Sequence, residues 1–159
     1  MGETQLIAEP GIPQVVMIRE FDAPPELLFR AYTEPELIPQ WLGPRRLEVE
    51  VEQLDVRHGG QWRYIHSDAD GSYPFRGVYH GTPSVEDGIT QTWEYEGAPG
   101  HVHLEVAKFE EIDGGTRLVL TAVYPQVESR DAAMASGMES GARESLERLD
   151  ELVGTLQPV

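Results

Sequence analysis

The stretch from Ser129 to Leu156 constrains the fold more than any other part of the chain, because its apolar and small residues recur at spacings of three and four. At about 100° per residue, such spacing gathers these residues on one side of a helix. The positions concerned are Met134, Met138, Ala142, Ser145, Leu149, Leu152, Val153 and Leu156. The pattern predicts one long amphipathic helix, with Ser129 as its N-cap, whose apolar side must be covered by a sheet or by other helices.

This apolar side is uneven along its length. Leucines dominate its second half, whereas its first half holds small or flexible residues, namely Met134, Gly137, Met138, Gly141, Ala142 and Ser145. A glycine inside a helix costs about 1 kcal/mol relative to alanine, so two of them four residues apart need a reason. One reason is close packing of the helix against a sheet. The other is an open space beneath the first half, walled by adaptable methionines.

The composition limits the partners of the chain. With 159 residues it is long enough for one domain with a sizeable core. Its 12 basic and 28 acidic residues give a formal charge of -16, which repels nucleic-acid phosphates and anionic membrane surfaces. The chain has no cysteine, and we find neither a leader peptide nor an apolar run of membrane-spanning length. We therefore expect a cytoplasmic monomer or homodimer that needs no cofactor, binds no nucleic acid and does not insert into a membrane.

The N-terminal part of the chain predicts a flexible lead-in over residues 1–13, followed by a single domain over residues 14–157. The β-branched run in Gln14–Phe21 predicts the first strand. Two short helices are expected next, over Glu26–Thr33 and Glu36–Trp41, each close to a proline that favours the start of a helix.

Between Arg45 and Tyr124 apolar and polar residues alternate in short runs separated by turn residues, which predicts six further antiparallel strands and about seven in all. The alternation changes phase near Gln53 and again near Phe109, and each change predicts a bulge or bend. The chain is therefore expected to have an α+β fold with one strongly curved sheet. Such a sheet can wrap around the C-terminal helix and leave a pocket wherever side chains do not fill the space.

Seven short motifs along the chain resemble those of a known family. They are Phe21-Asp22-Ala23-Pro24, Thr33-Glu34-Pro35-Glu36, Gln40-Trp41-Leu42-Gly43-Pro44, Gly59-Gly60-Gln61-Trp62, Gly77-Val78-Tyr79, Thr92-Trp93-Glu94 and Gly114-Gly115-Thr116-Arg117-Leu118. From about Val15 to Leu156 the chain is similar to the bacterial AHSA-type domains, which are named for their likeness to the activator of the heat-shock-protein-90 ATPase. These domains belong to the START/SRPBCC helix-grip superfamily, with lipid-transfer domains, pollen-allergen-like proteins and polyketide cyclases. The resemblance implies a sheet that grips the C-terminal helix around a pocket, but it implies no particular reaction.

Aromatic residues are concentrated in the three middle strands, on what we expect to be the concave face of the sheet: Trp62, Tyr64, Tyr73, Phe75, Tyr79, Trp93 and Tyr95. Rings of this size usually build the core, and the functional alternative is that they line a pocket. Trp41 is expected at the entrance, with Met134 and Met138 on the opposite wall. The predicted ligand-binding residues are Trp41, Trp62, Tyr64, His66, Phe75, Tyr79, Trp93, Tyr95, Met134, Gly137, Met138 and Gly141.

The five histidines predict no metal site. His101 and His103 project to one face of a strand, but Val102 and Leu104 are expected to face inward, which would turn both histidines to water. His66 shares the parity of the inward aromatic residues, and we expect it to be hydrogen-bonded or to reach solvent rather than to act as a base.

The sequence thus predicts a non-enzymatic protein that binds a small hydrophobic or aromatic molecule, a lipid among them, between the sheet and the C-terminal helix. One alternative is a cyclase, aromatase or hydrolase-like enzyme that uses His66 with Tyr64 or Tyr79 to move protons. Another is a module that binds a chaperone through an acidic convex face. The carboxylates expected on that face are Glu48, Glu50, Glu52, Glu94 and Glu96.

Overall fold

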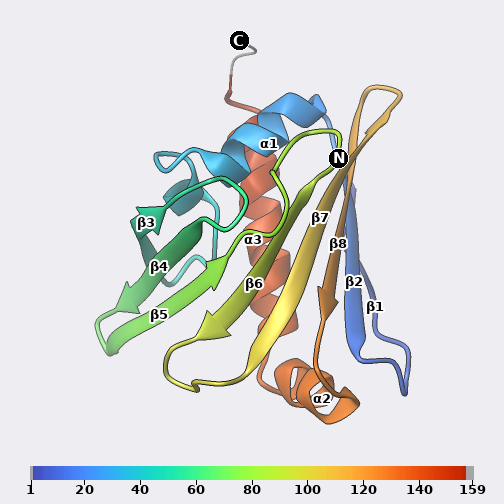
Figure 1. The fold of residues 1–159 in the computed structure, drawn as a ribbon. Coiled ribbons are helices and arrows are strands. Elements are labelled where there is room, and N and C mark those ends of the chain that lie inside the picture. The colour runs from blue at the N-terminus through green and yellow to red at the C-terminus, as the bar shows by residue number, and fades with distance from the viewer. Residues whose placement is uncertain (1, 157–159) are drawn as a thin grey trace.

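The computed structural model describes residues 2–156, which form a single antiparallel sheet and three α-helices. In chain order the elements are β1 (Gln5–Ile7), β2 (Gln14–Phe21), α1 (Pro25–Thr33), the 3-10 turn η1 (Ile38–Gln40), β3 (Glu48–Leu54), β4 (Gln61–Asp68), β5 (Gly71–Val78), β6 (Ile89–Tyr95), β7 (Val102–Ile112), β8 (Gly115–Val123), α2 (Val127–Ala135) and α3 (Met138–Val153). The strands follow the order β1-β2-β8-β7-β6-β5-β4-β3 across the sheet. Figure 1 shows this sheet in front of α3, which confirms the predicted α+β class.

The sheet has eight strands, one more than the seven expected. The additional strand is β1, which lies in the segment expected to be a loose lead-in and pairs with β2 from Gln5↔Ile18 to Ile7↔Val16. Two arginines hold the residue before it, since Arg19 donates to the Thr4 hydroxyl at 3.0 Å and Arg143 to the Thr4 carbonyl at 2.6 Å. The proline and glycine residues nearby concealed this short edge strand from the sequence pattern.

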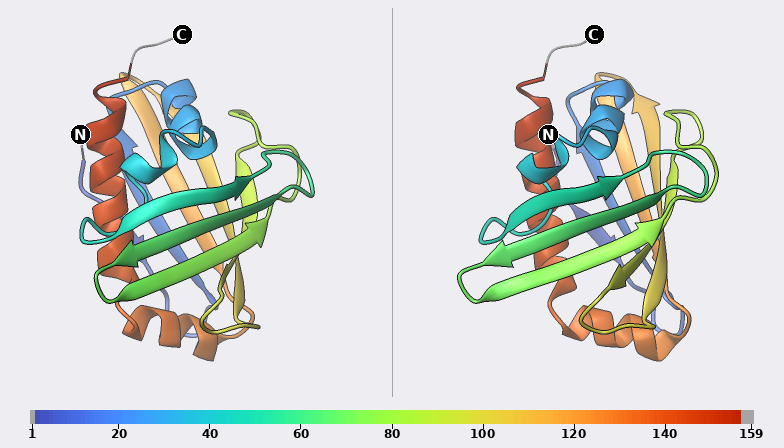
Figure 2. Two further views of the ribbon diagram at one scale, coloured as in Figure 1. Left: turned by 90° about the vertical axis from the view of Figure 1, so that its left-hand side faces the viewer. Right: turned by 60° about the vertical axis from the view of Figure 1, so that its left-hand side comes forward.

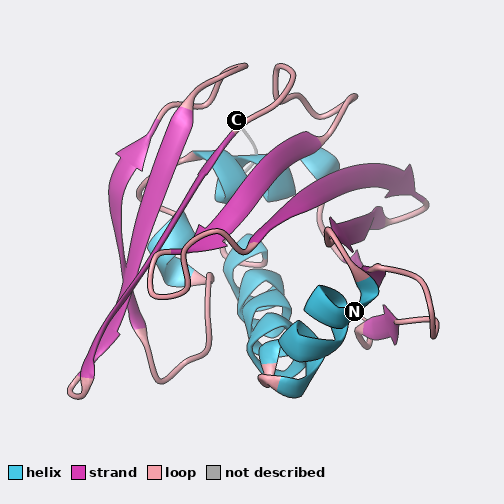
Figure 3. Ribbon diagram, turned by 60° about the horizontal axis from the view of Figure 1, so that its bottom comes forward, coloured by secondary structure: helices cyan, strands magenta, loops and turns pink. Residues whose placement is uncertain are grey.

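The sheet bends strongly around α3. The register between β3 and β4 shifts between Val51 and Gln53, which confirms the bulge predicted near Gln53. A second bend falls where β5 and β6 meet, because they pair only at Phe75↔Tyr95 and Arg76↔Glu94. In Figure 2 the strands β3, β4 and β5 accordingly cross in front of the others at a steep angle. With the bottom of the molecule turned toward the viewer, the sheet is an arch with the helices on its inner side (Figure 3).

The C-terminal helix is broken, and the prediction of one continuous helix from Ser129 to Leu156 is wrong. Helix α2 begins at Val127 rather than after an N-cap at Ser129, and α3 begins at Met138. Between them Gly137 has a φ of 88°. Glycine adopts this left-handed conformation without the steric cost that a Cβ imposes, and it is a common helix terminator. Only α3 lies along the sheet, while α2 turns across the end of the molecule (Figure 1).

The second half of α3 closes one end of the space inside the arch. Its buried side chains, Leu146, Leu149, Leu152 and Val153, join a continuous core with residues of α1 and of the central strands, such as Leu28 and Leu118. The predicted second short helix at this end is reduced to the turn η1, since the chain leaves helical geometry at Trp41, where φ is -138°. The solid core therefore occupies one half of the molecule and leaves the other half to the site described next.

Candidate functional site

Two adjoining spaces lie between the concave face of the sheet and the helices. The inner chamber has a volume of about 280 Å³ and is lined mainly by apolar and aromatic side chains from the sheet, η1 and α3. The outer groove, of about 1140 Å³, continues from it past the α2–α3 junction and the β6–β7 turn. The two spaces share one wall, formed by His66, Phe75, Trp93, His103, Met138 and Gly141. Together they form a pocket that opens toward solvent beside α2.

The first half of α3 leaves this space open because its residues are small. The two glycines there have different roles: Gly137 ends a helix, and a Cβ at Gly141 would meet only Pro44 Cδ, at an ordinary 3.8 Å. Close packing therefore does not explain Gly141. Ala142 and Ser145 continue the short side chains along the chamber, up to the plug that begins at Leu146.

Seven of the predicted ligand-binding residues line the inner chamber: Trp41, Tyr64, His66, Phe75, Trp93, Met138 and Gly141. Tyr95 and Gly137 line only the outer groove. Trp62, Tyr79 and Met134 line neither space, so the structure does not bring them to the site. Met134 lies on α2, where the break at Gly137 has turned it away from the α3 face that it was expected to share.

Trp62 and Tyr79 are core residues behind the pocket wall. The Trp62 ring packs at centroid distances of 4.4 Å from Tyr64 and 4.5 Å from Trp93, both of which face the chamber. A Cβ at Gly77 would lie 2.7 Å from the Trp62 ring, so the glycine makes room for the indole. Burial raises the pKa of Tyr79 to about 12. Of the catalytic candidates, only His66 and Tyr64 therefore reach the open space.

Trp41 lies at the inner end of the pocket and not at its entrance. The residue is buried, its indole N–H donates to the Ala31 carbonyl at 2.8 Å, and its ring packs 4.7 Å from that of Tyr32. The Gly43-Pro44 turn that follows lies against α3, near Ser145 and Gly141. Trp41 thus forms the floor of the inner chamber.

His66 points into the pocket from β4. Its side chain is buried against Gly43 and the Phe75 ring, with 6% of the residue exposed. Burial lowers the pKa of the imidazole from its usual 6.5 to about 4, so the ring is neutral at pH 7. Within residues 2–156 the imidazole makes no hydrogen bond, which leaves its nitrogens available to a bound molecule.

The side chains of strand β7 that point into the pocket are those that were predicted to point outward. Its register with β8 runs without a shift from Leu104 to Ile112, so the bend expected near Phe109 does not occur. Because Phe109 and Ala107 are buried, the same face carries Glu105 and His103 into the pocket. His103 stacks on Tyr124 at 4.9 Å and lies nearly parallel to Trp93 at 6.4 Å. The expectation that His103 faces water is therefore wrong, whereas His101 is exposed at the rim of the outer groove.

Four polar residues of the chamber were missed by the sequence analysis: Tyr32, Gln91, His103 and Glu105. Burial raises the pKa of Tyr32 and of Tyr64 well above 10, and the Glu105 carboxylate adds to both shifts. Both phenols are therefore neutral at pH 7. Counting the alternation of β7 backward from Phe109 without a phase change would have identified His103 and Glu105.

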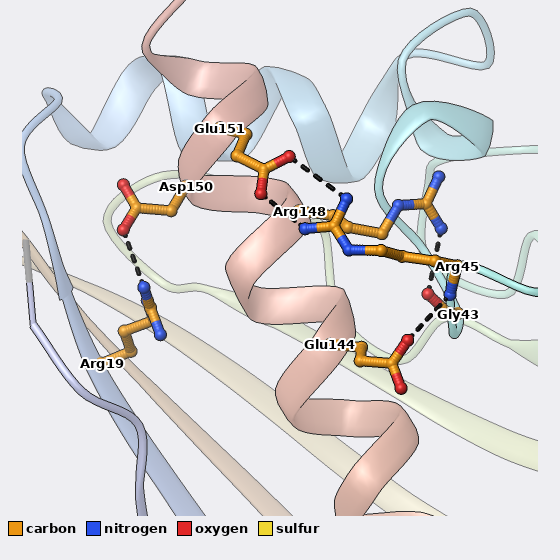
Figure 4. Close-up of polar contacts among 7 residues, drawn as sticks. All are labelled: Arg19, Gly43, Arg45, Glu144, Arg148, Asp150 and Glu151. Carbon is orange, nitrogen blue, oxygen red and sulfur yellow. Dashed lines mark hydrogen bonds and ion pairs between the residues drawn. The ribbon is translucent and has the colours of Figure 1, made fainter.

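The loop that carries the chamber floor is fixed to α3 by polar contacts (Figure 4). Arg148 donates to the carbonyl oxygens of Leu42 and Gly43 at 3.3 and 3.0 Å, and the Gly43 amide donates to the Ser145 hydroxyl at 2.8 Å. The Arg45 amide donates to Glu144 at 3.0 Å. Burial lowers the pKa of Arg148, an effect that the nearby Arg45 enhances. This wall of the pocket is preformed, because its backbone is held independently of any ligand.

Within residues 2–156, no three His, Asp or Glu side chains converge closely enough to bind a metal ion. None of the helices in the same range has the length and hydrophobicity that a membrane crossing needs. The chemistry of the site therefore has to be sought in its apolar walls and in a few polar groups.

A curved antiparallel sheet closed around one long helix, with a chamber between them, defines the helix-grip class of folds. Over residues 22–154 the sequence matches the model of the family described as Activator of Hsp90 ATPase homolog 1-like protein. The chain belongs to this family, which confirms the resemblance seen in its motifs.

Solved structures of bacterial proteins are similar to this chain over nearly its whole length. A crystal structure from Rhodobacter sphaeroides is 27% identical, with a TM-score of 0.86, and the match covers 97% of this chain and 100% of that one. Protein Ms6760 from Mycobacterium smegmatis is 22% identical, with a TM-score of 0.85 and coverage of 98% and 99%. The AHSA1 protein from Silicibacter pomeroyi is 24% identical, with a TM-score of 0.73 and coverage of 89% and 97%. No curated protein matched this chain. At 22% and 24% identity, the structures from Mycobacterium smegmatis and Silicibacter pomeroyi show only that the fold is shared.

Proposed function

We propose that this protein binds a small apolar or aromatic molecule, without covalent chemistry, in the inner chamber between the sheet and α3. The observation that carries the proposal is the chamber itself. About 280 Å³ lies beside residues that are small where the helix could have carried leucines. Apolar clefts of this kind, with a few polar groups converging on them, are the usual form of small-molecule sites.

Two further features support this proposal. Trp41, Tyr64, Phe75 and Trp93 offer ring faces and edges to a flat ligand, and Met138 supplies an adaptable side chain opposite them. The wall held by Arg148 and Ser145 is rigid, which lowers the cost of ordering the site when a ligand binds. The adjoining outer groove gives a ligand access from solvent.

The proposal is tested by titrating 2-naphthalenemethanol, a neutral two-ring aromatic alcohol, into the protein in a calorimeter. We expect saturable binding to the wild-type protein and an affinity at least about tenfold weaker for Ala142→Leu, whose side chain would fill part of the chamber. Ala135→Leu is the matched control, because Ala135 is exposed on α2 and lines neither space. Equal affinities for the two variants would contradict the proposal, as would the absence of binding.

The position of His66 favours one alternative, an enzyme that moves a proton on a bound polyketide-like substrate. The neutral imidazole beside Tyr64 in the chamber supplies a base and a hydroxyl donor of the kind that such a cyclisation needs. Its test is incubation with a linear poly-β-keto thioester, with product masses compared between the wild-type protein and His66→Phe. Loss of one water per molecule that depends on His66 would support the enzyme. Identical products from both proteins would dispose of it.

A chaperone-binding role remains a second alternative that rests on the family alone. The outward carboxylates expected to form an acidic convex face are partly neutralised, since Arg63 pairs with Glu52 and Glu96 at 2.6 and 2.7 Å and Arg76 pairs with Glu94 at 3.1 Å. A pull-down with the bacterial chaperone at low and high salt would test it. A salt-sensitive complex is the result that this alternative requires.

A further inference from the structure

The inner chamber has a single formally charged side chain. Among the described residues that line it, Glu105 is the only acidic residue, and none is a lysine or an arginine. Two histidines, His66 and His103, complete its titratable nitrogens. A mainly apolar cavity that holds one carboxylate and no lysine or arginine discriminates between ligands by charge.

Glu105 is built into the wall of the chamber and does not reach it from a mobile loop. It lies in the middle of β7, between Gln91 of β6 and Ala122 of β8, both of which are buried. Its side chain is 25% exposed, and its carboxylate lies 3.7 Å from Nε2 of His103. Among the described residues no arginine or lysine pairs with it. The carboxylate is therefore available to a donor on a bound molecule.

Aromatic residues surround this carboxylate. Tyr32, Tyr64 and Trp93 line the same chamber as Glu105, and Tyr124 stacks at 4.9 Å on His103, whose Nε2 lies 3.7 Å from the Glu105 carboxylate. The ring faces of such residues attract cations, and a carboxylate beside them strengthens that attraction. The outer groove continues the same bias, since its charged residues are Glu94, Glu128 and Glu144 against Arg46.

We infer that the ligand of this chamber is an apolar or aromatic molecule that carries a protonated amine, whose N–H groups donate to the Glu105 carboxylate, and that carboxylate-bearing molecules such as free fatty acids are excluded. The inference rests on the proposed function and specifies the ligand class of the same site. An anion would face Glu105 with no lysine or arginine in the chamber lining to offset it. An ammonium group would form an ion pair there, with its apolar body against Trp93 and Phe75.

Three probes that share one ring system test this inference: 2-naphthylmethylamine, 2-naphthalenemethanol and 2-naphthoate. Their affinities for the wild-type protein are measured by calorimetry at pH 7 and at about 0.15 M salt, where attraction to distant surface charges is screened. We expect the amine to bind at least about tenfold more tightly than the carboxylate, with the affinity of the alcohol between the two. Glu105→Gln should reduce the ratio of amine to carboxylate affinity to near one, while the alcohol still binds.

The matched control is Glu111→Gln, which removes the same charge from the same strand at an exposed position outside both spaces. It should keep the wild-type ratio, which separates a local effect of Glu105 from the overall charge of -16. Two results would overturn the inference if the alcohol still binds. One is a carboxylate that binds as tightly as the amine, and the other is a ratio of amine to carboxylate affinity that Glu105→Gln leaves unchanged. Failure of all three probes to bind would instead overturn the proposed function.

Discussion

The two halves of α3 face the same sheet and do opposite things. From Leu146 onward the helix presents large apolar side chains that pack in the core with α1 and the central strands. From Met138 to Ser145 it presents short or flexible ones, and the sheet opposite them surrounds a chamber of about 280 Å³. One helix thus supplies both a rigid core and an adaptable wall, and the change between them is made over a single turn.

The largest effect should come from the solid half. Leu149 is fully buried, so Leu149→Ala should destabilise the protein by about 2 to 5 kcal/mol through lost burial and a new cavity. Ala142→Gly, in the chamber half, should cost about 1 kcal/mol, which is the helix propensity difference alone. Urea unfolding of both variants measures the contrast, and equal losses would mean that the two halves are packed alike.

Acid should weaken the chamber half through His66. Its pKa is about 4 in the folded protein and about 6.5 in the unfolded chain, so between these values only the unfolded state binds the proton. Stability therefore falls as the pH drops through this window, by roughly 2 to 3 kcal/mol between pH 7 and pH 4.5. Urea unfolding of His66→Phe at the two pH values should lack this part of the loss.

The exposed His80 provides the control for that measurement. His80→Phe should lose as much stability on acidification as the wild-type protein does. If His66→Phe behaves in the same way as His80→Phe, the imidazole of His66 is not buried as described.

Arg148 connects the two halves, because it holds the Leu42–Gly43 loop against the middle of α3. Arg148→Met removes the donors and leaves partly buried carbonyl oxygens without these hydrogen bonds, which should cost about 1 to 3 kcal/mol in urea unfolding. Arg57→Met, at an exposed ion pair with Asp55, should change stability by no more than about 0.5 kcal/mol. Similar values for the two variants would show that the loop is not held by Arg148.

The smallest effects should differ in sign. Gly137→Ala places a Cβ at a φ of 88° and should destabilise the protein by roughly 1 to 2 kcal/mol. Gly141 lies inside α3, and the Cβ added by Gly141→Ala would meet no close neighbour, so this variant should be more stable than the wild-type protein by up to about 1 kcal/mol. Thermal unfolding of the pair measures both, and a loss of stability in Gly141→Ala would indicate close packing at that position.

Sequence patterns predicted the orientation of a strand correctly where the larger side chains of its alternating pattern are also the buried ones. Trp62, Tyr64 and His66 face inward as expected, because one face of β4 is consistently large and apolar. The same rule failed for β7, whose apolar residues Val102 and Leu104 lie on the outer face of the sheet while Glu105 lies inside. An apolar alternation shows which residues share a face, but when both faces carry apolar residues it does not show which face is inward.

The break in the C-terminal helix was hidden for a related reason. Gly137 fits the periodic apolar pattern, and the pattern alone does not show that its backbone is left-handed. The chamber was nevertheless predictable in outline, since the change from small residues to leucines along α3 is visible in the sequence. Its polar groups were not, because Tyr32, Gln91 and Glu105 come together only when separate elements are folded against one another.

The most direct test of the difference between the two halves is a crystal structure of the protein under xenon pressure, because xenon occupies apolar cavities without requiring a specific ligand. We predict xenon density in the inner chamber, in contact with Ala142 and Trp93, and none beside Leu149. Density beside Leu149, or a chamber closed by side chains with no xenon in it, would contradict this account.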